Sequence, residues 1–389
     1  MRSSIASLAL CLLVPAFAAA QDTFTNPVTL VDAADPGVLR VGDTYYMVTT
    51  SGWDPNGFPI RTSKDLRTWT EAGHVFPQAS RPAWAVTDYW APELHKVGSQ
   101  YVCYYTARDA SGRLCISSAS APSPTGPFTD IGHPLIRNEH VGSIDPAYFE
   151  DADGTRYLYW KSDGNDVGEP SRIWVQKLGP DGLSLTGEPT ALIQNDQPWE
   201  TSCVEGPAVV KKDGYYYLFY SGNMFDNPGY SVGVARSTSP MGPFEKHPGG
   251  PILHQGNDFT GTGHNSLVTD PEGNTFIVYH AYAGTQVVGP RVALVDRVRW
   301  ENGWPAVNDG MPGTTFVGPA KDPGLVPPPA PRPEPRPDPE PGPKPTPPPI
   351  EKPYHPGFWE RIGDWVHDRF DDVVARCRGL LRTLDRLGR

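Results

Sequence analysis

The chain has 389 residues, of which 11% are aromatic and 20% are charged, and its formal net charge is −11. This acidic balance argues against nucleic acid as a partner, because phosphates favour basic surfaces. The many Tyr and Trp residues instead suit a β-rich protein with aromatic surfaces for a flat, uncharged ligand such as a sugar.

Residues 1–20 have the pattern of a cleaved secretory signal. Arg2 precedes an apolar segment from Leu8 to Phe17, and alanines at 18–20 supply small residues before Gln21. The apolar segment is too short to span a bilayer. A buried N-terminal helix is the alternative. We therefore expect an exported chain with a secreted or periplasmic location.

Residues 21–320 carry a repeat. A turn glycine, followed three residues later by an aromatic residue, recurs at intervals of 56 to 60 residues and opens a strand-like run each time. The five glycines are Gly42, Gly98, Gly154, Gly214 and Gly273. Second strand-like runs follow in several copies, for example at 114–118, 172–176 and 231–235.

Units of this length can each hold a four-stranded blade, and five blades can close into a ring without a long exposed edge. Short strands with regular turn signals and little helical periodicity agree with an all-β fold. A β-sandwich is the alternative, but it does not explain five matching signatures. We predict a five-bladed β-propeller over residues 21–320.

The cysteines offer one candidate disulfide. Cys103 and Cys115 flank a turn-like segment at 108–112, so they could face each other across a hairpin. Export would permit this bond, but the spacing alone leaves it open. The sequence has no CxxC or HxxxH pattern that would indicate a zinc site.

Beyond residue 320 the composition changes twice. Residues 321–356 are rich in proline, which favours a stiff, extended, solvated spacer. Through residues 357–389, apolar side chains recur at steps of three and four and predict an amphipathic helix. This helix could associate with copies of itself, dock on a partner or lie on a membrane surface. Folding back onto the propeller is the alternative.

Ionisable residues occupy matched positions ahead of four repeat glycines. Asp145, Glu205 and His264 each lie nine residues before their glycine, and Asp35 lies seven before. If these positions begin the innermost strands, the four side chains converge at one mouth of the central channel. Chance placement of surface acids is the alternative.

Proline supports the assignment of these acids to strand starts. A proline follows Asp35 and Asp145 directly and follows Glu205 after one residue, and proline is confined to strand starts, edges and bulges. Converging carboxylates suit glycosidic bond cleavage, in which one protonated acid assists the leaving oxygen and one ionised acid activates water. A third carboxylate can raise the pKa of the acid and hold it protonated.

The ordered motifs resemble those of glycoside hydrolase family 43 over roughly residues 25–318. The motifs are Asp35-Pro36-Gly37-Val38, Trp90-Ala91-Pro92-Glu93, Ser143-Ile144-Asp145-Pro146, Val204-Glu205-Gly206-Pro207 and Gly263-His264-Asn265-Ser266. The resemblance implies a five-bladed propeller and an inverting mechanism. It implies Asp35 as general base, Glu205 as general acid and Asp145 as the residue that tunes the pKa of the acid and orients it.

Further candidates surround these acids. Asp32 is a rival for Asp35 but lacks the following Pro-Gly-Val. Arg291 looks like the family's late arginine that reaches the sugar; a surface salt bridge is the alternative. Trp90 and Phe58 could form apolar walls for a sugar face, or could pack between blades. Cys203 stands close to where relatives often carry glycine, and we expect it to affect local packing.

His264 resembles a histidine near the channel axis that, in many relatives, binds calcium or lies beside it through water. A satisfied core histidine is the alternative. Because calcium prefers oxygen ligands, any such ion would need water or carbonyl oxygens to complete its shell.

The favoured hypothesis is an exported, exo-acting α-L-arabinofuranosidase that acts on plant polysaccharides. The close alternatives are a β-D-xylosidase and an endo-1,5-α-L-arabinanase. A non-catalytic carbohydrate-binding propeller is the alternative from another class, and the presence of all three acids in their motifs argues against it.

Overall fold

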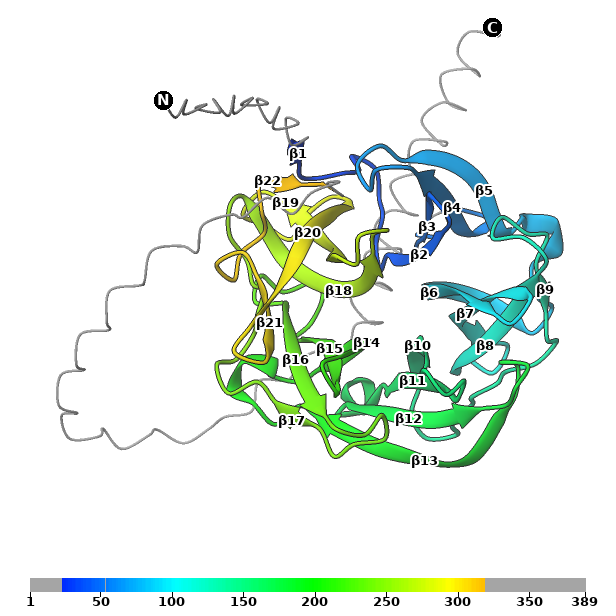
Figure 1. Cartoon of the computed structure of the whole chain (residues 1–389). Coiled ribbons are helices and arrows are strands. Elements are labelled where there is room, and N and C mark those ends of the chain that lie inside the picture. The colour runs from blue at the N-terminus through cyan, green and yellow to red at the C-terminus, as the bar shows by residue number, and fades with distance from the viewer. Residues whose placement is uncertain (1–22, 53, 319–389) are drawn as a thin grey trace, which may run out of the picture.

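A computed structural model describes residues 23–52 and 54–318. The predicted signal at 1–20, the predicted spacer at 321–356 and the predicted helix at 357–389 lie outside the described residues. The described part of the chain forms a ring of five blades, and Figure 1 shows this ring along its axis. The predicted five-bladed propeller is therefore confirmed.

Each blade is an antiparallel sheet of four consecutive strands. Blade one contains β2 (Gly37–Val41), β3 (Thr44–Val48), β4 (Gly57–Ser63) and β5 (Thr70–Phe76), and blade two contains β6 (Ala85–Val97), β7 (Gln100–Asp109), β8 (Leu114–Ala121) and β9 (Thr129–Asp130). Blade three contains β10 (Ser143–Glu150), β11 (Arg156–Ser162), β12 (Arg172–Leu178) and β13 (Leu185–Gln194). Blade four contains β14 (Val204–Lys212), β15 (Tyr215–Gly222), β16 (Ser231–Ser237) and β17 (Glu245–Lys246). Blade five contains β18 (Phe259–Thr269), β19 (Thr275–Ala283), β20 (Arg291–Glu301) and β21 (Trp304–Val307).

The repeat glycines form the turns between the first and second strands of each blade. All five have a positive φ, between 60° and 84°, which glycine adopts without a steric penalty. The first strands β2, β6, β10, β14 and β18 lie nearest the centre of the ring (Figure 1). Each blade therefore presents the start of its first strand to the same end of the axis.

The hydrophobic core lies between neighbouring blades. One cluster joins Val48 and Phe58 of blade one to Cys103 and Tyr105 of blade two, and equivalent clusters fill the other junctions. Full burial of one large apolar side chain stabilises a fold by about 1.5–3 kcal/mol. The blades are thus held by their mutual faces, which leaves polar side chains free to occupy the axis.

The N-terminal segment closes the ring. Strand β1 (Thr23–Thr25) pairs with β22 (Thr315–Val317). After β1, the backbone N–H of Val28 donates to the carbonyl of Ala293 at 2.8 Å, and that of Ala33 donates to Arg291 at 2.7 Å. Residues that precede blade one therefore lie against β20 of blade five.

The candidate disulfide is not formed. Strands β7 and β8 do make the expected hairpin, but Cys103 is opposite Ala119 and Cys115 is opposite Ala107. This register separates the two cysteines along the ladder. Both side chains are buried and free.

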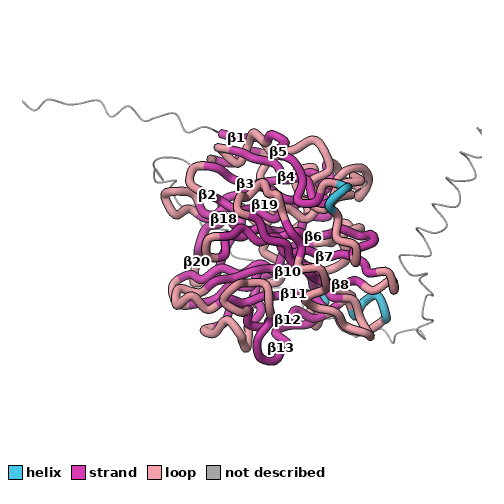
Figure 2. The backbone as a smooth tube through the Cα atoms, turned by 90° about the vertical axis from the view of Figure 1, so that its right-hand side faces the viewer, coloured by secondary structure: helices cyan, strands magenta, loops and turns pink. Residues whose placement is uncertain are grey.

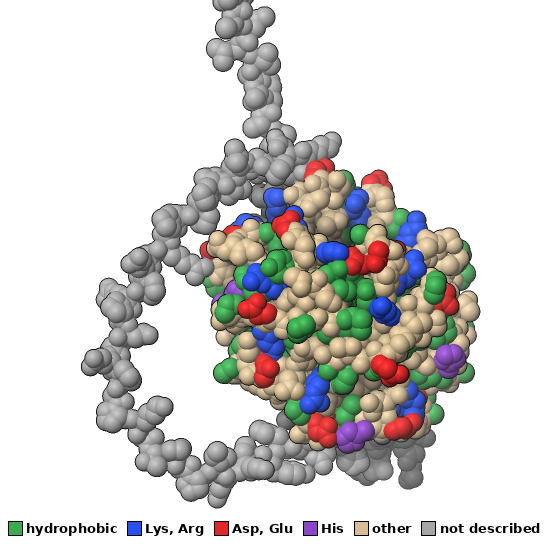
Figure 3. All heavy atoms as spheres, turned by 60° about the horizontal axis from the view of Figure 1, so that its bottom comes forward, with side chains coloured by type: hydrophobic (Ala, Val, Ile, Leu, Met, Phe, Trp, Pro, Cys, Tyr) green, Lys and Arg blue, Asp and Glu red, His purple; other side chains and the backbone are tan. Residues whose placement is uncertain are grey.

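Helical structure in the described ranges is limited to three short 3-10 turns, η1 (Gln78–Ser80), η2 (Gly164–Val167) and η3 (Pro198–Glu200). Figure 2 shows that strands and loops make up almost all of the remaining described backbone. Within residues 23–52 and 54–318, no helix has the length and apolarity needed to cross a membrane. On the face in Figure 3, acidic and basic side chains are interspersed.

Candidate active site

One backbone feature recurs in the innermost strand of each blade or, in blade one, just before it. A residue there has φ between 43° and 56°, and the register of the sheet breaks at this point in four blades. These residues are Asp35, Ala91, Asp145, Gly206 and His264. Such bulges turn side chains away from the regular pleat and are common beside active sites.

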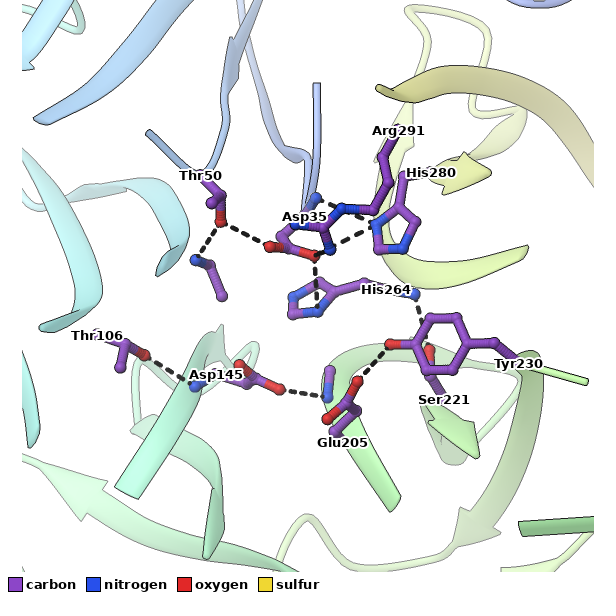
Figure 4. A network of polar contacts seen from close by, with 12 residues as sticks. Asp35, Thr50, Thr106, Asp145, Glu205, Ser221, Tyr230, His264, His280 and Arg291 are labelled. Atoms are coloured by element: carbon purple, nitrogen blue, oxygen red, sulfur yellow. Dashed lines mark hydrogen bonds and ion pairs between the residues drawn. The ribbon is translucent and has the colours of Figure 1, made fainter. Parts of the chain in front are cut away.

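This geometry corrects one part of the sequence interpretation. Glu205 is not in the position of Asp35, Asp145 and His264, because the left-handed residue of its blade is Gly206. A Cβ on Gly206 would lie 3.2 Å from the His264 ring, so glycine permits a close approach here. Glu205 nevertheless reaches the same group of polar side chains around the axis (Figure 4).

Asp35 is buried and held at both carboxylate oxygens. The Thr50 hydroxyl donates to Oδ2 at 2.6 Å, and Arg291 Nη1 donates to Oδ1 at 3.0 Å. Nδ1 of His264 lies 3.5 Å from the same Oδ1. Burial opposes ionisation, but Arg291, His264 and His280 outweigh it and hold the pKa of Asp35 well below its usual value. Asp35 is therefore a carboxylate at neutral pH.

The pKa of Asp145 is shifted in the opposite direction, above its usual value. Its Oδ2 accepts a hydrogen bond from the backbone N–H of Gly206 at 3.0 Å. Burial raises the pKa of Asp145 to about 6, and the negative charge of Glu205 adds to the rise while His264 and Lys161 oppose it. Asp145 thus takes up a proton far more readily than an exposed aspartate.

Glu205 is buried among three hydrogen-bond donors, one of which is the thiol of Cys203, 3.2 Å from Oε2. The Tyr230 hydroxyl donates to Oε1 at 2.7 Å, and Lys161 Nζ donates to Oε2 at 2.9 Å. Burial acts to raise the pKa of Glu205, but Lys161 and Tyr230 bring it below the usual value. The resemblance led us to expect a raised pKa for this acid. The sequence interpretation had not included the lysine that lowers it.

His280 anchors Asp35 from blade five. Nδ1 of His280 lies 3.2 Å from the backbone N of Asp35 and also 3.2 Å from its Oδ1. Nε2 of His280 is buried and has no hydrogen-bond partner among the described residues. Burial lowers the pKa of His280 to about 4, and Arg291 and His264 add to this lowering. His280 is therefore neutral at neutral pH.

The three residues predicted to contact the sugar, Arg291, Trp90 and Phe58, lie in different environments. Arg291 contacts Asp35, and its guanidinium lies 4.9 Å from the ring centroid of Phe225. Trp90 is partly buried in β6, directly before the left-handed Ala91. Phe58 is 0% exposed and packs against Phe76, Tyr89 and Tyr105. Phe58 is thus a core residue between blades, and its predicted role as a sugar wall was wrong.

His264 presents Nδ1 to Asp35 and lies beside Gly206. Burial lowers its pKa, but the charges of Asp35, Asp145 and Glu205 more than compensate, so the pKa is raised. Within residues 23–52 and 54–318, no group of three or more His, Cys, Asp and Glu side chains is arranged to hold a metal ion. His264 is therefore part of the carboxylate network in this structure.

Sequence reasoning missed four residues of this network: Thr50, Lys161, Tyr230 and His280. Two of them had a usable signal. Lys161 and His280 each follow aromatic residues inside a strongly apolar strand, and a polar residue buried in such a strand requires a partner. Thr50 and Tyr230 carry no comparable signal, because hydroxyl side chains are common at strand ends and in loops.

The arrangement brings three carboxylates to one end of the ring axis in distinct electrostatic settings. Asp35 is held ionised by positive neighbours, while burial and the charge of Glu205 raise the pKa of Asp145, and Glu205 forms an ion pair with Lys161. An ionised carboxylate can accept a proton from water, and a protonated carboxyl can supply one to a leaving group. The site therefore has the parts required for acid–base hydrolysis.

Comparison with known proteins agrees with this chemistry. The profile described as "Glycosyl hydrolases family 43" matches residues 24–305. A "Xylosidase/arabinosidase" of Butyrivibrio fibrisolvens is 30% identical over 302 residues, which cover 74% of this chain and 56% of that protein. A β-D-galactofuranosidase of Aspergillus niger is 31% identical over 292 residues, which cover 70% of this chain and 81% of that protein.

A solved structure shares the fold. The crystal structure of a thermostable family-43 glycoside hydrolase matches with a TM-score of 0.67 and 35% identity. The match covers 73% of this chain and 95% of that chain. The propeller thus corresponds to nearly the whole of that protein, whereas the chain spans little more than half of the Butyrivibrio relative.

Proposed function

The chain belongs to glycosyl hydrolase family 43, whose members are inverting glycosidases, and from this premise we propose that it is an exo-acting α-L-arabinofuranosidase acting on plant polysaccharides. The names of its relatives support a pentose or furanose substrate, since they include a xylosidase/arabinosidase and a galactofuranosidase. β-D-Xylosidase and endo-1,5-α-L-arabinanase activities are the alternatives within the family.

The observation that carries the proposal is the contrast between Asp35 and the Asp145–Glu205 pair. Inverting hydrolysis requires one carboxylate that is ionised and one carboxyl that is protonated, on opposite sides of the scissile bond. The positive neighbours of Asp35 support the first role. For the second role, the negative charge of Asp145 beside Glu205 favours a proton on Glu205, while the ion pair with Lys161 opposes it and lowers the pKa of Glu205.

In the proposed reaction, Asp35 is the general base. It removes a proton from a water molecule as the water oxygen attacks the anomeric carbon. Arg291 and Thr50 hold the carboxylate at one oxygen each, which fixes its orientation. Arg291 also keeps Asp35 ionised, so the base is available down to low pH.

Glu205 is the proposed general acid. As the bond between the anomeric carbon and the leaving oxygen breaks, the carboxyl proton of Glu205 passes to that oxygen. Glu205 must first gain this proton, and a sugar ring that excludes water from the carboxylate favours its protonated form. Asp145 assists by its negative charge and, through Gly206 N–H, fixes the backbone that follows Glu205.

Calcium remains a prediction. His264 is the residue that the resemblance associates with the ion, but its ring faces Asp35, and imidazole nitrogen is not a favoured calcium ligand. Within the described residues, no three His, Cys, Asp or Glu side chains are placed to hold a metal ion directly, so the predicted ion would be bound through water and carbonyl oxygens. Elemental analysis of the purified protein before and after treatment with a chelator tests the prediction.

Export is also a proposal, supported by the pattern of residues 1–20. Sequencing the N-terminus of the protein recovered from a secreting host tests it, with a new terminus close to Gln21 as the expected result. The self-association, partner docking or surface attachment predicted for residues 357–389 concerns residues outside the described structure.

Three parallel assays test the activity, using nitrophenyl α-L-arabinofuranoside, nitrophenyl β-D-xyloside and linear arabinan. Turnover of the arabinofuranoside, with single arabinose units released from arabinan, is the expected result. Internal cleavage of arabinan alone would overturn the exo assignment. Sugar binding without turnover of any substrate would instead indicate a non-catalytic propeller.

Glu205→Gln and Asp35→Asn test the roles of the acids, and each should abolish oligosaccharide hydrolysis while preserving the fold. Asp213→Asn is the matched control, because Asp213 is an exposed turn residue of the same blade as Glu205.

A further inference from the structure

A cross-blade hydrogen bond repeats around the axis. In four junctions of the described ring, a side chain at the end of the second strand accepts the N–H of the left-handed residue in the next blade. The pairs are Thr50 with Ala91 at 2.9 Å, Thr106 with Asp145 at 3.1 Å, Ser221 with His264 at 2.7 Å and His280 with Asp35 at 3.2 Å. Figure 4 shows several of these contacts.

The junction between blades three and four breaks the pattern. The register of β10 and β11 places Lys161 opposite Ile144, in the position that Thr106 and Ser221 hold in their blades. An ammonium group has no lone pair and cannot accept a hydrogen bond. The N–H of Gly206 therefore goes to Asp145 Oδ2 instead.

Lys161 does not bond the N–H of Gly206 and instead forms two ion pairs. Its Nζ lies 2.9 Å from Glu205 Oε2 and 2.8 Å from Asp163 Oδ1, and its side chain is only 2% exposed. Removing one member of such a buried network leaves a charge without its partner, which is costly. A lysine at this one junction, where the others use neutral acceptors, thus couples blade three to the proposed acid.

We propose that Lys161 is a positioning residue for the glycosidase reaction, which fixes Oε2 of Glu205 and, balanced by Asp163, governs how readily Glu205 takes up the proton that it donates. This inference rests on the proposed role of Glu205 as general acid. Lys161 acts through Glu205.

The two oxygens of Glu205 have different partners. Oε2 faces Lys161 and the thiol of Cys203, whose Sγ lies 3.2 Å away. Oε1 faces the Tyr230 hydroxyl, which can either donate or accept. A proton on Oε1 makes the carboxyl neutral but leaves Oε2 free to accept the hydrogen bond from Lys161, and Oε1 is the oxygen assigned to proton delivery.

Other charged and titratable groups also surround Glu205. They are Asp163 after β11, Cys203 before β14, Tyr230 before β16, His264 on β18, Asp145 on β10 and Asp35 before β2. Most of them are proposed acids or contact one directly. Lys161 and Asp163 are the pair that can be altered while all three proposed acids are retained.

The experiment compares Lys161→Met with Asp163→Asn through the pH dependence of kcat/KM on α-1,5-arabinobiose. The basic limb of this profile reports the essential acid of the free enzyme. Lys161→Met removes the positive charge beside Glu205, so this limb should move up by at least one pH unit. In Asp163→Asn, Glu205 becomes the remaining ion-pair partner of Lys161. Its pKa falls, so the basic limb should move to lower pH. Lys161→Arg keeps the charge, so its basic limb should lie closer to that of the wild type than the limb of Lys161→Met does, whatever its effect on the rate.

Opposite shifts distinguish a positioning role from simple packing, which would lower the rate without moving the limb. If Glu205→Gln abolishes turnover but neither variant moves the basic limb, the inference about Lys161 is overturned and the proposed function stands. Full activity of Glu205→Gln would instead refute the proposed function. If Lys161→Met does not fold, Asp163→Asn decides: a downward shift supports the role, and an unmoved limb overturns it.

Discussion

Arg291 and Asp35 are 256 residues apart in the chain, yet Nη1 of the arginine donates a hydrogen bond to Oδ1 of the aspartate at 3.0 Å. They meet because the segment that precedes blade one lies against β20. The closure of the ring and the protonation state of the proposed base therefore depend on the same junction.

Replacing Arg291 by Met should move the acidic limb of the kcat/KM profile to higher pH. Without the guanidinium, the largest of the interactions that lower the pKa of Asp35 is lost and this pKa rises, so the base is lost at a pH where the wild type retains it. We expect a shift of at least one unit, measured on nitrophenyl arabinofuranoside. Arg299→Met, on the exposed end of the same strand, should leave the limb in place. An unmoved limb in Arg291→Met would show that Arg291 does not set the ionisation of Asp35.

Leaving-group dependence should separate the acid from the base. Glu205→Gln cannot protonate the leaving oxygen, so arabinobiose hydrolysis should fall by about 10²–10⁴-fold. A nitrophenyl leaving group needs little protonation, so its loss in this variant should be much smaller. Asp35→Asn should slow both substrates to a similar extent, since water activation is common to both. The reverse pattern would exchange the two assignments.

Asp145→Asn should lower kcat and move the basic limb of kcat/KM to lower pH. The amide keeps an oxygen that can accept the N–H of Gly206, so the local backbone is preserved. The negative charge beside Glu205 is lost, and that charge favours protonation of Glu205. Asp153→Asn, in an exposed turn of the same blade, is the control. A basic limb that rises would contradict the electrostatic role of Asp145.

The lowered pKa of His280 predicts that the free energy of unfolding depends on pH. The folded-state pKa of about 4 lies below the ordinary 6.5, so the unfolded chain binds the proton first as the pH falls. The contribution of His280 to the free energy of unfolding is constant above pH 6.5 and declines as the pH falls below this value. The loss is complete near pH 4 and amounts to about 3 kcal/mol, which follows from the difference between the two pKa values. The variant His280→Gln should not show this loss of stability at low pH.

Urea unfolding at pH 7 and pH 4.5 checks this prediction. The free energy of unfolding of the wild type should fall more than that of His280→Gln over this interval. Comparing the two proteins removes the effect of carboxylates that titrate in both. Equal pH slopes would mean that His280 is not held neutral by the fold.

The buried thiols should resist modification in the native state. Burial raises the pKa of Cys115 to about 11 and also raises the pKa values of Cys103 and Cys203, and the thiolate is the reactive form. Iodoacetamide should label these three cysteines only after denaturation, as read by peptide mass spectrometry. A peptide that links Cys103 to Cys115 under non-reducing conditions would contradict the register of β7 and β8.

Much of the fold was predictable because its signals are local. A glycine with positive φ and a strand of aromatic residues recur in each blade, so spacing alone revealed five units. The acids ahead of these turns were predictable for the same reason. The one-residue difference between Glu205 and the equivalent positions was not, because bulge geometry does not appear in a count of residues.

Interactions across blades were hidden from the sequence. Phe58 looked like a candidate sugar wall because its strand was visible but the neighbouring blade that covers it was not. Lys161 was missed because its partner Glu205 lies on the next blade, and only the folded ring shows that its neutral counterparts are acceptors. Cys103 and Cys115 were placed on the correct hairpin, but sequence could not specify the register.

The closure of the ring also has a consequence in time. Asp35 is made early, whereas His280 and Arg291 follow 245 and 256 residues later. At synthesis rates of about 5–20 residues per second, this is a delay on the order of tens of seconds. A chain still on the ribosome therefore has its proposed base without the groups that keep it ionised, and the site is assembled only when the last blade has been made.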